Sequence, residues 1–103
     1  MLDISIYDMD TKEEREALLK KVDDLYSTIT DSQWDALSLV SEPAYNADGS
    51  KPMENSAMAL RRKNAMAWNG SEGVWYLTEI GRLLLEAQGS NWDNLKKIYL
   101  DMD

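Results

Sequence analysis

The feature that most constrains the fold is a pair of short apolar, aromatic segments, residues 65–68 and 74–77, separated by Asn-Gly-Ser-Glu-Gly. A five-residue link rich in glycine and polar residues is typical of a β-hairpin. With that link, side-chain alternation places Trp68 and Tyr76 on the core face of the hairpin and Trp75 on its exposed face. The sequence therefore predicts one two-stranded antiparallel hairpin.

Helix start and stop signals divide the rest of the chain. Capping-box patterns begin at Thr11 and Thr30, Pro43 ends the second helix, and Thr78 and Ser90 are expected to cap later helices. Apolar residues at helical spacing support each assignment. The five predicted helices cover approximately residues 12–28, 31–41, 53–65, 79–88 and 90–103.

Two segments fall outside these elements. Leu2, Ile4 and Ile6 alternate with polar residues, which fits either a short strand or an extended arm packed on a neighbour. Residues 43–52 contain two prolines, a glycine and several small polar residues, so they are expected to form a loop. Tyr45 is a candidate for docking that loop onto the body of the protein.

Charge is distributed unevenly along the chain. The 103 residues include 19 acidic and 11 basic side chains, for a net charge of −8. Residues 1–48 contain twelve acids and four bases, whereas residues 49–82 contain three acids and five bases. An acidic chain repels nucleic acid and anionic membranes on average. Any phosphate-binding surface is therefore expected in the second half.

The composition excludes several classes of function. Without cysteine or histidine, the chain forms no disulfide, no Cys/His zinc site and no Cys–His or Ser–His catalytic pair. No carboxylate pair or glycine-rich phosphate loop stands out, so we expect neither enzymatic activity nor a cofactor. No apolar run exceeds four residues, which is too short to span a membrane. The N-terminus lacks signal-peptide features, so a cytoplasmic location is expected.

Residues 59–68 and 74–84 resemble a winged helix-turn-helix domain of the MarR-like branch and its small phage and bacterial relatives. In that family the recognition helix ends in L-x-R-K/R-G-L-V, and a hairpin leads into Y-x-L-T-x-x-G-R-x-L-L. Here Leu-Arg-Arg-Lys-Asn and Tyr-Leu-Thr-Glu-Ile-Gly-Arg-Leu-Leu match these patterns. Residues 30–39 are similar to the family helix that opens with L-T-x-x-Q. The loop at 43–52 departs from the family's short helix, and Asn64 replaces a glycine while still tolerating the left-handed conformation.

The resemblance implies a mostly helical α+β fold in one domain covering residues 1–103. A winged-helix core at 30–88, with three helices and a two-stranded wing, would be flanked by an arm and helix at 1–29 and a C-terminal helix at 90–103. It also implies a transcriptional regulator that binds double-stranded DNA. Terminal helices often build a dimer in such relatives, so a homodimer is expected, with a monomer as the alternative.

By this resemblance the third helix enters the major groove, where Arg62 would read guanine and Asn55 adenine. The expected DNA contacts are Lys51, Asn55, Met58, Arg61, Arg62, Lys63, Asn69 and Ser71. A structural alternative stays open for the basic run at 61–63, because cations at a helix C-terminus stabilise the helix dipole without any ligand.

The acidic first half supports a second hypothesis from a different class. A surface of carboxylates would mimic DNA or dock onto a basic protein, as in phage-type inhibitors such as anti-CRISPR proteins. The residues proposed for that partner surface are Asp23, Asp24, Asp31 and Asp35. Charge reversal at these positions separates the two hypotheses, because it abolishes partner binding only if the acidic surface is the functional one.

Overall fold

Five α-helices and one two-stranded sheet make up the part of the chain that the computed structural model describes, residues 4–42 and 51–102. The elements are η1 (Ile6–Asp8), α1 (Lys12–Tyr26), α2 (Asp31–Ser41), α4 (Glu54–Arg62), β1 (Met66–Asn69), β2 (Val74–Leu77), α5 (Glu79–Gln88) and α6 (Trp92–Leu100). The predicted mostly helical α+β class is confirmed. A strand at the N-terminus is not, because residues 6–8 form a 3₁₀ turn. Tyr45 and most of the predicted loop lie outside the described residues.

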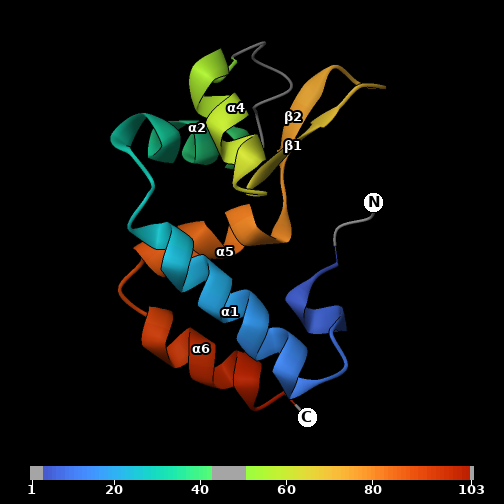
Figure 1. The fold of residues 1–103 in the computed structure, drawn as a ribbon, viewed down its shortest axis with the longest axis vertical. Helices are drawn as coiled ribbons and strands as arrows, with labels where there is room; N and C mark the ends of the chain where they lie inside the picture. The colour runs from blue at the N-terminus through green and yellow to red at the C-terminus, as the bar shows by residue number, and fades with distance from the viewer. Residues whose placement is uncertain (1–3, 43–50, 103) are drawn as a thin grey trace.

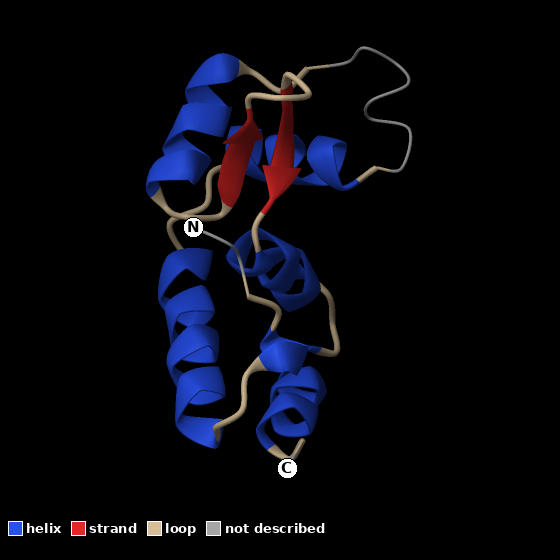
Figure 2. Cartoon of the chain, turned by 90° about the vertical axis from the view of Figure 1, so that its right-hand side faces the viewer, coloured by secondary structure: helices blue, strands red, loops and turns tan. Residues whose placement is uncertain are grey.

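The molecule is elongated, 40 × 28 × 23 Å in extent, and its elements form two ends joined by one helix. At one end, α1 and α6 lie side by side with η1 beside them; we call this the bundle end (Figure 1). At the other, α2, α4 and the hairpin form what we call the hairpin end (Figure 2). Helix α5 lies between them and packs on α1 as well as on α2 and β2.

One continuous hydrophobic core joins the two ends through α5. Val22 of α1, Leu37 of α2, Leu60 of α4 and Leu84 of α5 are all fully buried and belong to the same cluster. The apolar spacing that predicted the helices describes much of their buried faces, but Met53 and Ile98, which that spacing includes, are exposed. It does not identify Arg15, which the spacing places on another face but which is buried, with Nη1 donating to the carbonyl of Met9 at 2.9 Å.

Threonine hydroxyl groups cap the N-termini of three of the helices, as predicted. Thr11 accepts a hydrogen bond from the Glu14 N–H, and Thr78 accepts one from the Gly81 N–H. Thr30 and Gln33 form a complete capping box at the start of α2. The predicted cap at Ser90 is wrong: α6 begins one residue later, after Asn91, without a side-chain hydrogen bond to the first turn.

The register of the hairpin differs from the predicted one by a single residue. Asn69, expected in the link, pairs with Val74, so Trp68 lies opposite Trp75 and Ala67 opposite Tyr76. The tighter turn forms because the Asn69 Oδ1 atom accepts the N–H groups of residues 71 and 72, and Gly73 adopts a φ of 68°. A one-residue shift moves every side chain to the opposite face. The predicted core pair, Trp68 and Tyr76, is therefore wrong, and both residues are exposed.

A close junction ties the base of the hairpin to α5. Asn64 ends the turn after α4 with a φ of 61°, a left-handed conformation that asparagine tolerates better than most residues. The Thr78 hydroxyl donates to the Asn64 carbonyl at 2.5 Å, and the Thr78 N–H donates to the Ala65 carbonyl at 3.3 Å. A Cβ atom at Gly81 would lie only 2.0 Å from that Ala65 carbonyl oxygen. The missing side chain at Gly81 therefore permits the close packing of α5 on the backbone at Ala65.

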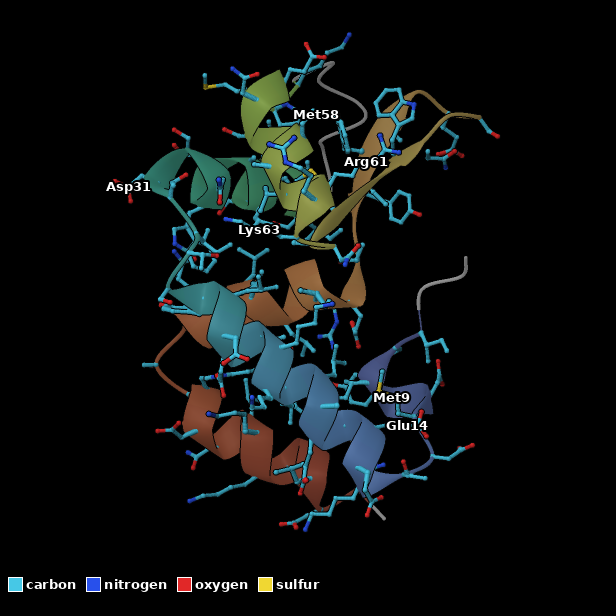
Figure 3. The ribbon with its side chains drawn as sticks, viewed as in Figure 1. Met9, Glu14, Asp31, Met58, Arg61 and Lys63 are labelled. Carbon is cyan, nitrogen blue, oxygen red and sulfur yellow. The ribbon has the colours of Figure 1, made fainter. Side chains whose placement is uncertain are left out.

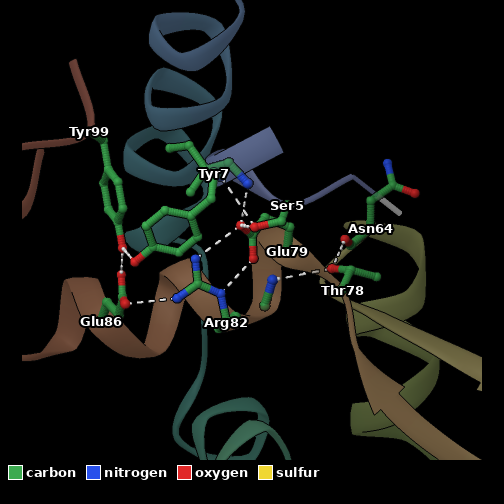
Figure 4. A network of polar contacts seen from close by, with 10 residues as sticks. Ser5, Tyr7, Asn64, Thr78, Glu79, Arg82, Glu86 and Tyr99 are labelled. Atoms are coloured by element: carbon green, nitrogen blue, oxygen red, sulfur yellow. Dashed lines mark hydrogen bonds and ion pairs between the residues drawn. The ribbon is translucent and has the colours of Figure 1, made fainter. Parts of the chain in front are cut away.

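A buried carboxylate at the start of α5 holds the N-terminal arm (Figure 4). Glu79 accepts hydrogen bonds from the Ile6 N–H and the Ser5 hydroxyl, and it forms an ion pair with Arg82. Burial alone would raise the pKa of Glu79, but the hydrogen bonds from Arg82, Ile6 and Ser5, with the Arg82 charge, lower it below its usual value. The arm is therefore attached to α5 through an ionised side chain.

Candidate nucleic-acid interface

Helix α4 directs different rows of side chains to the core, to the hairpin and to solvent. Ala57 and Leu60 are fully buried and hold the helix against the body of the protein. Side chains four and seven residues apart lie on one face of a helix. The row that faces the hairpin is Glu54, Met58 and Arg61. In Figure 3, Met58 and Arg61 lie on the hairpin side of α4. Met58 and Arg61, two of the expected DNA contacts, thus point toward the hairpin.

A second exposed row runs along the outer face of α4. Asn55 lies in its first turn and Arg62 at its last residue, seven positions apart, with the small side chain of Ala59 between them. Asn55 and Arg62 are exposed, and neither side chain has a hydrogen-bond or ion-pair partner in residues 4–42 and 51–102. This outer row therefore presents an amide and a guanidinium group to solvent on one face.

A groove of about 390 Å³ separates α4 from the hairpin. Met58 and Arg61 line it from the helix, Trp68 and Trp75 from the two strands, and Lys51 from the segment before α4. The two indole rings meet edge to face, with centroids 5.3 Å apart and planes at 65°. Three of the predicted contact residues, Lys51, Met58 and Arg61, are thus brought together around an aromatic pair.

Lys63 does not join the other basic residues of this region. Its ammonium group donates to the Thr28 carbonyl at 2.8 Å and to the Gln33 Oε1 atom at 2.7 Å. Burial lowers the pKa of Lys63 from its usual value. Figure 3 shows the side chain directed toward α2. In this structure Lys63 therefore connects α4 to the start of α2 instead of facing solvent.

The two DNA contacts expected at the tip of the hairpin, Asn69 and Ser71, have different surroundings. Asn69 uses its Oδ1 atom to accept the N–H groups of Ser71 and Glu72, so this side chain builds the turn. Ser71 is exposed at the tip. The Ser71 hydroxyl group is therefore better placed than the Asn69 side-chain carbonyl for contact with another molecule.

The four acidic residues of the second hypothesis have unequal surroundings. Asp23 accepts hydrogen bonds from the Trp92 indole at 2.9 Å and from Lys96 at 3.1 Å, so it joins α1 to α6. Asp24 forms an ion pair with Lys20 at 3.7 Å. Asp31 and Asp35 are exposed on α2, and no ion pair involves them in the part of the chain that the structure describes. Of these four residues, only Asp31 and Asp35 lack an ion-pair partner among the described residues.

Comparisons with models of protein families, with curated proteins and with solved structures find no match to this chain. Among the described residues, no group of three or more acidic side chains is arranged to hold a metal ion. No described helix has both the length and the apolar character needed to cross a membrane. The functional argument therefore depends on the α4 and hairpin geometry.

Proposed function

We propose that this protein binds double-stranded DNA and acts as a transcriptional regulator with a winged-helix arrangement. In this proposal α4 is the recognition helix, the outer row of α4 faces base edges, and the tip of the hairpin lies along the sugar–phosphate backbone. The B-DNA major groove is about 12 Å wide and accepts one α-helix. An exposed helix beside a projecting hairpin suits this mode of docking.

The observation that carries the proposal is the outer row of α4. Arg62 offers the planar donor pair that recognises guanine, and Asn55 offers the donor and acceptor that recognise adenine. Both side chains are exposed and unpaired among the described residues, so neither has to break an internal contact before reading a base. Ser71 is exposed at the hairpin tip and has a hydroxyl group suited to a phosphate oxygen.

The distribution of charge supports one orientation on DNA. Acidic side chains predominate on η1 and α1, at the bundle end, whereas residues 54–77 contain three bases and two acids. Repulsion of η1 and α1 from the phosphates would turn α4 and the hairpin toward the duplex. The net charge of −8 predicts weak binding at physiological salt.

The test is a fluorescence-anisotropy titration of a mixed-sequence duplex at low salt. Arg62→Ala is expected to weaken binding by about five- to 100-fold, corresponding to about 1–3 kcal/mol for a base contact. Lys21→Ala is the matched control, because Lys21 is an exposed, unpaired cation on α1 and its removal changes the net charge equally. Equal losses for the two variants would show that α4 is not the interface.

A different result would favour the acidic protein-binding module. If the chain binds no duplex at low salt, and a basic protein co-purifies in stoichiometric amount, the DNA proposal fails. Asp31→Lys with Asp35→Lys is then expected to abolish that association, because these are exposed acids without ion-pair partners in the described structure. Retention of the partner by this double variant would contradict the module hypothesis as well.

A further inference from the structure

The groove between α4 and the hairpin has the chemistry of a site for a flat ring joined to an anion. Its walls combine the Trp68 indole and the Met58 thioether with the cationic groups of Lys51 and Arg61. Neither cation has a side-chain hydrogen bond or ion pair in residues 4–42 and 51–102. Glu54 is the single acidic side chain among the described lining residues. The groove therefore favours an anionic ligand.

Trp68 is held in place without being covered. Its ring contacts Trp75 edge to face, and 48% of the residue remains exposed to solvent. Gly73 also lines the groove, and a side chain at that position would meet no atom within 4 Å, so the wall is low there. A planar group can therefore enter over Gly73 and stack on the exposed indole surface.

We propose that this groove binds an unpaired nucleotide, with the base stacked on Trp68 and the phosphate held by Arg61 and Lys51. Every base has a flat face, so stacking on an aromatic side chain accepts any sequence. This inference deepens the proposed function and rests on it: the outer row of α4 reads the duplex, while the neighbouring groove takes a nucleotide from a frayed, flipped or overhanging end.

The test compares a blunt duplex with the same duplex extended by three unpaired nucleotides, again by anisotropy. The native chain is expected to bind the extended duplex about tenfold more tightly, the gain expected from stacking one base. The readout is the ratio of the two affinities. Trp68→Ala is expected to bring that ratio close to one, and Trp68→Phe, which keeps an aromatic ring, is expected to retain most of the gain.

Tyr76→Ala is the matched control, because Tyr76 is a similarly exposed aromatic residue on the opposite face of the same hairpin. It should leave the affinity ratio unchanged. Competition by deoxyadenosine monophosphate distinguishes the source of the nucleotide. If the mononucleotide removes the gain, the groove accepts a free nucleotide, whereas no competition at millimolar concentration shows that the base must belong to a strand.

The outcomes separate this inference from the proposed function. Equal affinity of the native chain for the two duplexes overturns the nucleotide site and leaves duplex binding intact. A gain that survives in Trp68→Ala, or that disappears equally in Tyr76→Ala, also overturns it. Binding of neither DNA overturns both proposals.

Discussion

Replacement of Gly81 by alanine tests the junction that positions α4 and the hairpin. Glycine inside a helix costs about 1 kcal/mol relative to alanine, so Gly81→Ala at an open site would stabilise the protein. At this site the new Cβ atom would lie 2.0 Å from the Ala65 carbonyl oxygen, whereas real Cβ contacts essentially never fall below 3.0 Å. Helix α5 and the backbone at Ala65 would have to separate by about 1 Å.

Overpacking of this kind costs about 1–3 kcal/mol or more, and here the obstructing atom belongs to the backbone and cannot rotate away. After the gain in helix propensity, we expect a net loss of about 2 kcal/mol. For a domain of this size that corresponds to a decrease in Tm of about 10 °C. The sign of the change is informative, because only the close approach to Ala65 makes alanine unfavourable.

The assay is thermal unfolding followed by circular dichroism, with the free energy of unfolding from urea titration. Gly89→Ala is the matched control: its Cβ atom would lie 3.3 Å from the Glu86 carbonyl oxygen, and Gly89 has a negative φ that alanine adopts readily. We expect Gly89→Ala to change the stability by no more than about 0.5 kcal/mol. A Gly81→Ala variant that is as stable as the native chain would refute the junction as described.

Three further changes test the neighbouring contacts. Glu79→Gln should lower the free energy of unfolding at pH 7 by about 2 kcal/mol, because it removes an ionised acceptor. Since the pKa of Glu79 lies below its usual value in the folded state, its stabilising effect is present above that usual value and is lost as the pH falls through the folded-state pKa. The free energy of unfolding from urea titration should therefore fall less between pH 7 and pH 3 for Glu79→Gln than for the native chain. Asn64→Val should cost about 1–2 kcal/mol at a φ of 61°, whereas Asn64→Gly should cost nothing. Leu60→Ala should cost about 2–5 kcal/mol in the same assay, because Leu60 is fully buried in the core.

Local signals in the sequence located the helices, apart from the start of α6 and the end of α4, but did not give the hairpin register. Thr30 and Gln33 cap a helix by themselves, so a short window of sequence identifies its start. The register depends instead on which residue begins the turn, and Asn69 belongs to both the strand and the turn through its pairing with Val74. The pattern Asn-Gly-x-x-Gly at residues 69–73 indicates such a turn. The length of the link alone does not.

The sequence predicted which segments carry the candidate site, but it did not predict how their side chains are arranged in space. The basic residues 61–63 are consecutive in the sequence, but in the structure their three side chains point in three directions. Arg61 faces the groove, Arg62 faces solvent and Lys63 bonds to the carbonyl of Thr28. The direction of the Lys63 side chain depends on its hydrogen bond to Thr28, 35 residues away, so no local sequence pattern predicts it. The aromatic groove was missed for the same reason, because it requires the correct hairpin register.

The most direct test of DNA binding by this face is an NMR titration of the ¹⁵N-labelled protein with a short duplex at low salt. Our account predicts that the largest amide shifts occur in residues 51–77, including Asn55, Arg62 and Ser71, with small changes on α1 and α6. Shifts that concentrate on α1 or α6, or an unchanged spectrum at a several-fold excess of duplex, would contradict it.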